Sequence, residues 1–235
     1  MLQSAFENQG LTVKTQTRIE RLEISHDKVQ VHYAGDVPTD TVDKVLVAIG
    51  RRPNIEHLNL QAAGVVTEKG AIKVNPSLQT NIPHIYALGD VISGMSLAHS
   101  AEKEGQVLAM NLLNGTENRM NVGTVPRVAF CHPEVAAIGV TAADAGIKTL
   151  TLPQVPNGRA LVDKVAPAFM KLFVEEKTER IAGAVIIGEA ATEMIHELAL
   201  AMENKLTLGQ IAQTVHVHPT HSKNILHAVQ HALHG

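Results

Sequence analysis

The sequence has a single cysteine and no tryptophan, and aromatic residues make up only 3% of its 235 positions. The lone Cys131 closes no disulfide within the chain and supplies no pair of thiols for dithiol chemistry. Its isolation fits a reducing compartment such as the cytoplasm. Scarce aromatic rings and a formal net charge of −3 offer neither stacking surfaces for bases nor a basic surface for phosphates. We therefore expect a cytoplasmic protein without a nucleic-acid partner.

Long hydrophobic runs are also missing. No apolar segment approaches the roughly 20 residues that cross a bilayer, and the first residues lack the basic-then-apolar pattern of a signal peptide. At the same time 45% of the residues are hydrophobic and 18% are charged, which is typical of a globular protein. We expect no membrane partner and enough core for one large domain or two modest ones.

Residues 1–122 alternate short apolar segments with glycine turns, as in an α/β domain. Apolar and polar residues alternate from Val29 to Tyr33, which with Arg21–His26 predicts an antiparallel hairpin. The continuous apolar run Val45–Ile49 is typical of a strand buried on both faces of a parallel sheet. Further strands are expected at residues 11–17, 71–74 and 84–88, and helices at residues 1–10 and 98–113.

Residues 123–235 have a different pattern, which predicts an antiparallel sheet with helices grouped on one face, an α+β domain. A hairpin is expected at residues 168–175 and 181–188, and an amphipathic helix follows at residues 190–203. We place the domain boundary near residue 122. The remaining elements expected here are strands at residues 127–138 and 149–155, a capped helical turn at residues 141–144 and a helix at residues 224–234.

Asp90 follows Gly89 at the carboxyl end of an expected strand, the place where open α/β sheets bind ligands. A carboxylate there accepts hydrogen bonds from sugar or polyol hydroxyls, although the dipeptide taken alone is more often a simple turn with a local Asp hydrogen bond. The next loop leads into a helix that begins near Ala98, and a helix N-terminus favours an electron-rich group. Acid, loop and helix start together predict a cofactor site.

Three histidines, His216, His218 and His221, lie close together in the sequence and prompt the hypothesis of a metal site. No carboxylate or thiolate lies nearby to complete such a site, so we expect no metal. Proton transfer suits His218 better, because an imidazole titrates near neutrality, and a capped loop is the alternative. Cys131 and His132 point to opposite faces of a strand, so we interpret Cys131 as structural.

Six motifs occur in order along nearly the whole chain. They lie at residues 47–54, 85–91, 97–105, 130–136, 157–160 and 216–220. Together they resemble the C-terminal half of the pyridine nucleotide-disulfide oxidoreductase family (class I), and within it the dihydrolipoamide dehydrogenases. The form His-x-His-Pro-Thr is closer to that branch than to glutathione or mercuric reductases.

This resemblance implies a fold and three domain parts. The expected fold is an α/β Rossmann-like remnant of the FAD/NAD(P)-binding domains, followed by an α+β interface (dimerisation) domain with an antiparallel sheet. Residues 1–54 match the C-terminal part of the NAD-binding domain, and residues 55–122 match that of the FAD-binding domain. Residues 123–235 match the interface domain, which implies a homodimer formed through these residues.

FAD and NAD are the implied cofactors. Gly50 matches the glycine that lies against the nicotinamide nucleotide; taken alone, it is equally well a turn residue. Asp90 matches the acid that binds the ribityl chain of FAD. The residues that match the loop and helix start in contact with FAD are Ser96, Leu97, Ala98 and His99.

His218 matches the catalytic base that removes a proton from the dihydrolipoamide thiol and acts at the redox centre of the other subunit. The resemblance further implies lipoyl domains of 2-oxo acid dehydrogenase complexes as partners, and a cis bond between His218 and Pro219.

The departures from the family are as informative as the matches. The 235 residues contain neither its Gly-x-Gly-x-x-Gly motif nor its Cys-x-x-x-x-Cys pair. We therefore expect them to be inactive by themselves, as part of an enzyme that oxidises protein-bound dihydrolipoamide with NAD+. A fragment of a glutathione-reductase-like enzyme and a non-catalytic dimerisation module are the alternatives. In addition, Lys223 stands where the family places a glutamate five residues after the catalytic histidine.

The substitution Lys223→Glu in a complete enzyme that contains this chain is expected to speed dihydrolipoamide oxidation. A carboxylate orients the imidazole and stabilises its protonated form, whereas an ammonium does the reverse. Steady-state turnover of the two proteins is the measurement. Equal turnover would show that Lys223 is no defect.

Overall fold

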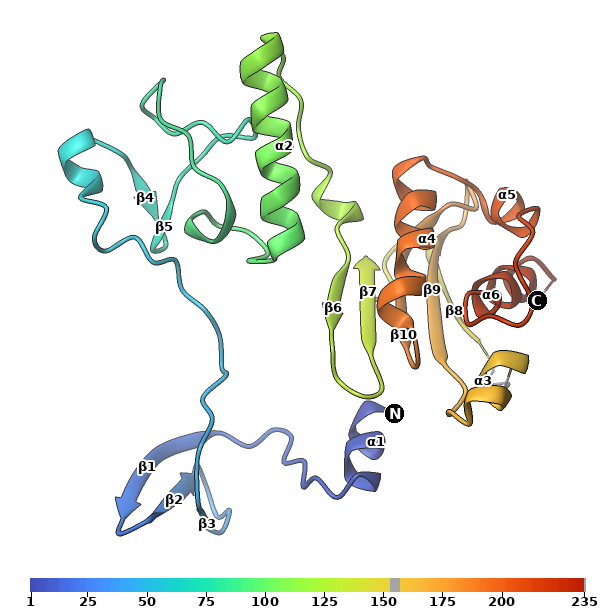
Figure 1. Cartoon of the computed structure of the whole chain (residues 1–235), viewed down its shortest axis with the longest axis horizontal. Coiled ribbons are helices and arrows are strands. Elements are labelled where there is room, and N and C mark those ends of the chain that lie inside the picture. Colours follow the sequence, from blue (N-terminus) through green and yellow to red (C-terminus); the bar gives the residue numbers. More distant parts are fainter. Residues whose placement is uncertain (153–156, 235) are drawn as a thin grey trace. The chain divides into compact units, whose positions relative to one another are not determined.

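The computed structural model describes residues 1–152 and 157–234, which form two compact units with a division after Arg51 (Figure 1). The first unit begins with helix α1 (Leu2–Asn8). A three-stranded antiparallel sheet follows, in the order β1 (Ile19–Ser25), β2 (Lys28–Tyr33) and β3 (Asp40–Val42). The predicted hairpin is thus confirmed.

Polar contacts join this sheet to the preceding loop. The Tyr33 hydroxyl donates to Asp40 Oδ2 at 2.6 Å, and Lys14 pairs with the same carboxylate while its ammonium lies 4.7 Å from the Tyr33 ring centroid. The Lys14 ammonium, followed by the Tyr33 hydroxyl, lowers the pKa of the Asp40 carboxyl.

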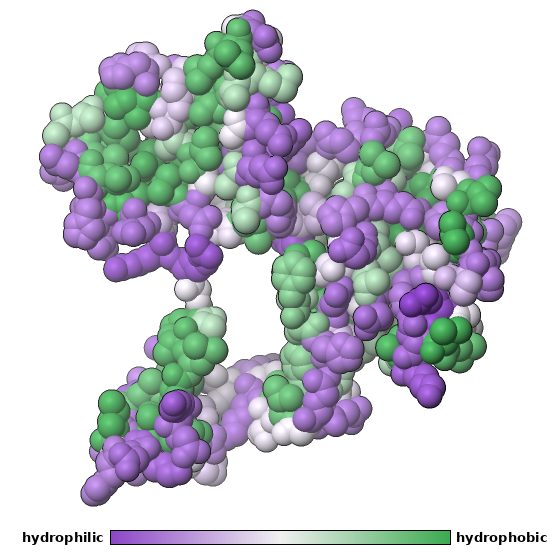
Figure 2. Space-filling view, viewed as in Figure 1, coloured by the Kyte–Doolittle hydropathy of each residue, from purple (hydrophilic) through white to green (hydrophobic). Residues whose placement is uncertain are grey.

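Two strands predicted in this unit are not formed. Residues 11–17 are loop and turn, and Val45–Ile49 is extended backbone that pairs with no described strand. A strand needs a neighbour to accept and donate its ladder hydrogen bonds, and without one the side chains of Leu46 and Ile49 are 92% and 94% exposed. Figure 2 shows hydrophobic surface along this connection after β3.

The second unit starts with a small cluster of short elements: 3-10 helix η1 (Leu60–Ala63), strands β4 (Thr67–Glu68) and β5 (Ala71–Ile72), and 3-10 helix η2 (Gly89–Val91). The strand predicted at residues 84–88 is absent, and Tyr86 makes only an isolated bridge with Gln79. Again, no described strand lies beside this segment. The buried apolar side chains that pack together between these elements are Val65, Ile72, Leu78, Ala87 and Ile92.

Helix α2 (Ala98–Asn114) packs against η2 and ends as predicted. Gly115 adopts a left-handed conformation, φ 64°, that closes the helix. At 17 residues α2 is the longest helix among the described residues, and none of the described helices combines the length and apolarity that a membrane span requires.

The C-terminal part contains a five-stranded antiparallel sheet in the order β6-β7-β10-β9-β8, preceded by 3-10 helix η3 (Val122–Thr124). The predicted hairpin is confirmed as β9 and β10. The strands are β6 (Arg127–Ala129), β7 (Val135–Gly139), β8 (Ile147–Thr151), β9 (Phe169–Glu175) and β10 (Ile181–Ile187). The helices are α3 (Gly158–Asp163), α4 (Ala191–Glu203), α5 (Leu208–Ala212) and α6 (Lys223–His234).

Several predictions for this part need correction. The single strand predicted at residues 127–138 is two, β6 and β7, because Pro133 has no N–H for a ladder and a turn with a cis His132–Pro133 bond intervenes. No helical turn forms at residues 141–144, and α3 and α5 were not predicted. The strand predicted at residues 149–155 is β8 as far as it is described, and residues 153–155 lie outside the described residues.

Apolar side chains of the sheet and of α4, α5 and α6 form the larger core. It buries Ile138, Leu172 and Ile186 from the strands completely. From the helices it buries Leu198 and Ile225 to the same extent. Burying a side chain of this size contributes about 1.5–3 kcal/mol, so this core anchors the loops described below.

Two glycines face each other where β7 meets β10, in the register Gly183↔Gly139. A Cβ atom on Gly183 would lie 2.0 Å from the Val140 carbonyl oxygen, and one on Gly139 would lie 2.1 Å from that of Ala182. Only residues without a side chain fit here, because both obstacles are backbone atoms.

Gly183→Ala is expected to lower the free energy of unfolding by about 1–3 kcal/mol or more, since overpacked backbone has to move. The matched control is Gly209→Ala in α5, where a Cβ meets nothing closer than Thr207 Oγ1 at 3.8 Å. An alanine inside a helix is expected to stabilise by about 0.5–1 kcal/mol. Urea unfolding followed by circular dichroism measures both. Equal effects of the two changes would contradict this packing.

Candidate functional site

His218 lies on the loop between α5 and α6, a segment without regular structure. The His218–Pro219 bond is cis, as predicted, and the Thr220 hydroxyl donates to the Val217 carbonyl at 2.7 Å. The imidazole is exposed, and a Cβ on Gly158 would lie 3.1 Å from its Cε1 atom. The ring therefore rests on the first residue of α3 while remaining accessible.

Asn157 connects α3 to this loop. Its side chain, on a residue that is 6% exposed, accepts from the Ala160 backbone N–H at 2.8 Å and so caps α3. The same amide donates to the Thr220 carbonyl at 3.2 Å and to Asn224 Oδ1 at 2.8 Å. One buried side chain thereby joins the start of α3, the residue after Pro219 and the first turn of α6.

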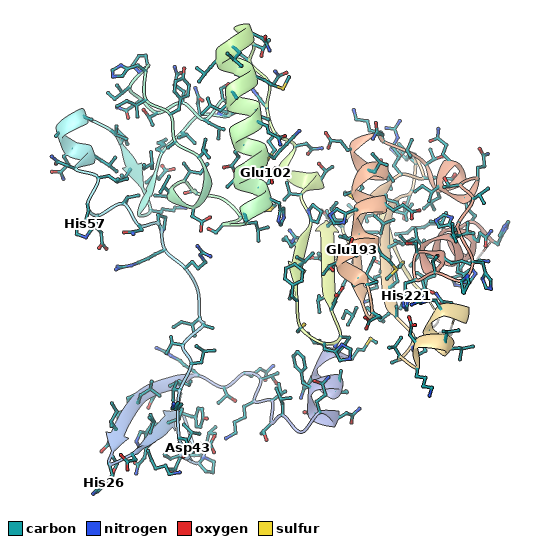
Figure 3. The ribbon with its side chains drawn as sticks, viewed as in Figure 1. His26, Asp43, His57, Glu102, Glu193 and His221 are labelled. Atoms are coloured by element: carbon teal, nitrogen blue, oxygen red, sulfur yellow. The ribbon has the colours of Figure 1, made fainter. Side chains whose placement is uncertain are left out.

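An ion-pair cluster reinforces this connection. Arg159 Nε donates to Asp163 Oδ2 at 2.6 Å, and His221 Nε2 lies 3.0 Å from the same oxygen. Hydrogen bonding from Arg159, and then from His221, lowers the pKa of the Asp163 carboxyl despite the opposing effect of desolvation. Figure 3 labels His221 beside α3 and α6. The cluster thus holds α3 against the residue that follows Thr220.

His216 is the buried end of the loop, with 4% of its side chain exposed. Its Nδ1 atom lies 2.9 Å from the Thr214 carbonyl oxygen and its Nε2 atom lies 2.8 Å from Glu197 Oε1 on α4. Both neighbours accept hydrogen bonds, so His216 fixes the loop to the core rather than offering a ring nitrogen to a ligand.

Lys223 is the nearest charged group to His218, with its Nζ atom 3.4 Å from the ring Nδ1. His227, one turn further along α6, has a lowered pKa because burial disfavours its charge and because Lys223, His216 and His218 are close. Lys223 therefore provides the positive charge beside His218, and burial together with Lys223 disfavours a further charge on His227. Among the described residues, no three His, Cys, Asp or Glu side chains are placed to hold a metal ion.

The residues predicted to contact FAD gather at the start of α2. Asp90 is half-buried in η2, which packs against α2, and a Cβ on Gly89 would lie 3.3 Å from the Ala101 Cβ. Ser96 adopts φ 50°, and Leu97 provides no side-chain cap for the helix. The first N–H groups of α2 therefore have no capping side chain. These N–H donors suit an electron-rich ring, and the Asp90 carboxylate suits the hydroxyls of an attached chain.

His99 has a different partner. Its Nε2 atom lies 2.8 Å from the Pro126 carbonyl oxygen, so the ring joins α2 to the segment before β6. Ala98 is exposed. Glu104, which sequence reasoning did not single out, accepts from the Gly89 N–H at 2.7 Å and from the Ser100 hydroxyl at 3.3 Å, so it fixes η2 to the helix.

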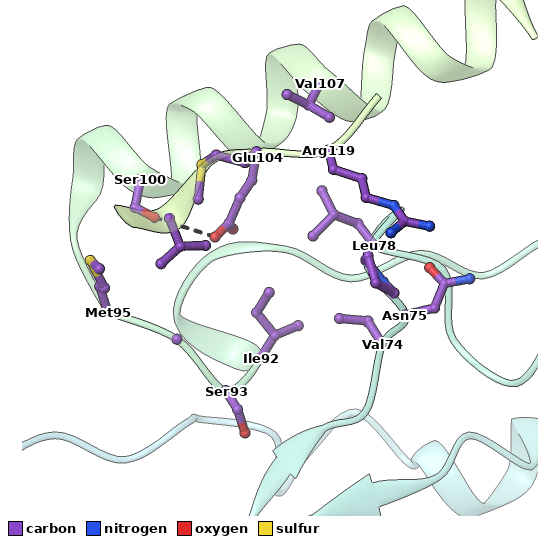
Figure 4. A pocket seen from close by; sticks show the side chains of 14 residues that line it. Val74, Asn75, Leu78, Ile92, Ser93, Met95, Ser100, Glu104, Val107 and Arg119 are labelled. Atoms are coloured by element: carbon purple, nitrogen blue, oxygen red, sulfur yellow. Dashed lines mark hydrogen bonds between the residues drawn. The ribbon is translucent and has the colours of Figure 1, made fainter. Parts of the chain in front are cut away.

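A cavity of about 320 Å³ lies behind this helix start (Figure 4). Its walls are mainly apolar, with Glu104 and Arg119 as the charged residues. Met95 and Ile92 line it, whereas Asp90 and residues 96–99 do not. The cavity and the predicted FAD contacts thus lie on different parts of the same loop.

Gly50 lies in the first unit and is exposed with φ 148°, a conformation that other residues rarely adopt. A Cβ there would meet nothing within 4 Å. Its predicted contact with the nicotinamide nucleotide therefore stays a prediction. Asp90 lies in η2, and Ser96 and Leu97 lie on the loop that leads from η2 into α2.

Comparison with known proteins identifies the family of this chain. Residues 1–105 match the pyridine nucleotide-disulphide oxidoreductases, and residues 125–229 match the dimerisation domain of the same family. The chain belongs to the pyridine nucleotide-disulphide oxidoreductases. The expected fold class, a mixed α/β part followed by an antiparallel α+β domain, is confirmed.

Relatives at the sequence level include the dihydrolipoyl dehydrogenases of Geobacillus stearothermophilus and Thermus scotoductus. The first is 36% identical over 99% of this chain and 51% of its own length. The second is 37% identical over 100% of this chain and 52% of its own length. The chain thus spans about half the length of these relatives.

Solved structures agree with this grouping. LpdA from Mycobacterium tuberculosis superposes with a TM-score of 0.89 at 29% identity, covering 98% of this chain and 51% of LpdA. The HOCl-induced flavoprotein disulfide reductase RclA from Escherichia coli, in its Cu(II) complex, gives 0.87 at 26% identity, covering 97% of this chain and 53% of RclA.

The Asp163 cluster is expected to make the free energy of unfolding depend on pH in the acid range. A lowered pKa in the folded state means that the carboxylate stabilises the fold above the ordinary value of 3.8 and ceases to do so as the pH falls through the folded-state pKa. The difference in unfolding free energy between the parent and Asp163→Asn is therefore expected to be present at pH 5 and to disappear towards pH 2.

Urea unfolding at a series of pH values measures this difference, with Asp36→Asn at an exposed loop position as the control. A difference that stays constant across the acid range would contradict the role of the ionised carboxylate.

Proposed function

We propose that this chain is the C-terminal part of an FAD-dependent enzyme that oxidises protein-bound dihydrolipoamide to lipoamide with NAD+ as acceptor. The observation that carries the proposal is the exposed His218 imidazole on a loop held by Asn157 and by the Asp163 cluster. It stands in a chain whose relatives are named dihydrolipoyl dehydrogenase. A proton-transferring group needs both access to substrate and a fixed position, and this loop supplies both.

His218 is the proposed proton acceptor. Its ring takes the proton from a dihydrolipoamide thiol, and the resulting thiolate is the nucleophile for a disulfide. That disulfide comes from outside these residues, because Cys131 is the only cysteine in the sequence. The site is therefore completed by other polypeptide, in our proposal by the second subunit of a homodimer formed through residues 123–235.

Asp90 and residues 96–99 are the proposed FAD contacts, and Gly50 is the proposed NAD contact. The Asp90 carboxylate accepts from a hydroxyl of the ribityl chain, and the uncapped start of α2 stabilises negative charge on the ring system. FAD, when bound, supplies the chemistry that passes two electrons from the thiols to NAD+. Cytoplasmic location and lipoyl-domain partners belong to the same proposal.

RclA favours a second candidate, because that similar structure is named a flavoprotein disulfide reductase. In that case the substrate is a disulfide, as in the glutathione-reductase-like alternative, and His218 protonates the departing thiolate. A non-catalytic dimerisation module is the third candidate, because residues 125–229 match the dimerisation domain and the sequence has no pair of cysteines.

A chimera tests the proposal, with the N-terminal half of the Geobacillus stearothermophilus relative joined to this chain. We expect it to bind FAD and to form NADH from dihydrolipoamide and NAD+. His218→Gln is expected to lower kcat by about 10²–10⁴-fold, the usual contribution of a general base. Flavin absorbance and sedimentation equilibrium provide the control that each protein is folded and dimeric.

Three results would count against the proposal. A folded, FAD-loaded dimer that is unaffected by His218→Gln would remove the imidazole from the mechanism. Reduction of glutathione disulfide in preference to dihydrolipoamide oxidation would favour the reductase. A folded dimer without either activity would favour a module that only dimerises.

A further inference from the structure

The neighbour of His218 decides which of its ring nitrogens is free. Lys223 Nζ lies 3.4 Å from Nδ1, and an ammonium has three donors and no acceptor. In this contact Nδ1 must accept, so the proton of the neutral ring lies on Nε2. A neutral imidazole has one N–H and one lone pair, and here the lone pair points at the lysine.

The rest of the surroundings favours the same arrangement. The Cε1–Nε2 edge of the ring lies over α3, where a Cβ on Gly158 would be 3.1 Å from Cε1 and 3.5 Å from Nε2. The Nδ1 edge is therefore the one that faces α6. Asn157 holds the following residue through the Thr220 carbonyl, so the backbone that carries the ring is fixed as well.

No carboxylate competes with Lys223 among the described residues. Glu197 is paired with His216, and Asp163 is paired with Arg159 and His221. The other titratable groups near the ring on α6 and on its own loop are the imidazoles of His227, His216 and His221, and an imidazole supplies no carboxylate oxygen. Among the described residues, the polar contact of His218 Nδ1 is thus with a donor, Lys223.

We infer that Lys223 is a positioning residue that holds His218 in the tautomer protonated at Nε2. What this tautomer means for catalysis rests on the proposed function. His218 then carries its N–H on Nε2, which suits a thiolate or another anionic acceptor rather than a neutral thiol. To take a proton at Nε2, the ring must first break its contact with Lys223 and exchange tautomers.

Nitrogen NMR of the 15N-labelled 235-residue chain tests this inference without cofactor or substrate. Long-range 1H–15N correlation spectra distinguish the protonated from the unprotonated nitrogen of each neutral ring. Spectra are recorded near pH 8.5, about two units above the ordinary imidazole pKa. His218→Gln identifies the signals. The variants are Lys223→Arg, which keeps a cationic donor, Lys223→Met, which removes it, and Lys223→Glu, which replaces it with an acceptor.

We expect the parent and Lys223→Arg to carry the His218 proton on Nε2 alone. In Lys223→Met the Nδ1–H form becomes detectable, with a shift of about tenfold in the tautomer ratio for loss of a charge-assisted hydrogen bond. In Lys223→Glu the Nδ1–H form predominates. A parent ring protonated on Nδ1, or a ratio that is the same in the parent and in Lys223→Met, overturns the inference.

A second measurement keeps the test valid if a variant does not fold. Diethyl pyrocarbonate modifies the unprotonated nitrogen of a neutral ring, which in His218 is Nδ1 in contact with Lys223, so in the parent chain His218 is expected to react at least about tenfold more slowly than the exposed His57. Equal rates at the two exposed rings overturn the inference. The chimera separates this inference from the proposed function. Turnover that depends on His218, with the same tautomer ratio in the parent and in Lys223→Met, refutes only this inference. Turnover that does not depend on His218 refutes only the proposed function.

Discussion

The buried amide of Asn157 is the interaction on which the His218 loop depends. It caps the N-terminus of α3, and it also holds Thr220 on the loop and Asn224 in α6, more than sixty residues further along the chain. A side-chain amide suits this position because it accepts and donates at the same time. A serine or aspartate in its place caps a helix equally well but has no N–H for the Thr220 carbonyl.

Charge around this loop is divided between two sides. On the α3 side, Asp163 is paired with Arg159 and His221. On the α6 side, Lys223 supplies a positive charge, and Glu197 on α4 is paired with His216. His218 lies between them and contacts the basic side. Among the described residues, Asp163 and Glu197 are already paired with other side chains. His218 therefore contacts the Lys223 ammonium instead of a carboxylate.

The helix start at α2 is a different kind of site. There the polar groups are backbone N–H groups and the Asp90 carboxylate, arranged around a close approach of Gly89 to Ala101. Glu104 stabilises this approach from inside by accepting from the Gly89 N–H. The site depends on helix geometry, whereas the His218 site depends on side-chain contacts between distant segments. The chain thus carries two candidate sites that are held by different kinds of contact.

Local pattern by itself determined the hairpins of both sheets, helices α2, α4 and α6, and the candidate residues His218 and Asp90. These features depend on the periodicity of neighbouring residues and on short motifs, which a sequence displays directly. Tertiary structure decided the rest. Val45–Ile49 has the composition of a buried strand, but a strand forms only where another strand completes its hydrogen bonds. In the same way, the contacts of Asn157 with Thr220, of His216 with Glu197 and of His221 with Asp163 are set by packing between remote segments, for which no spacing in the sequence gives a signal.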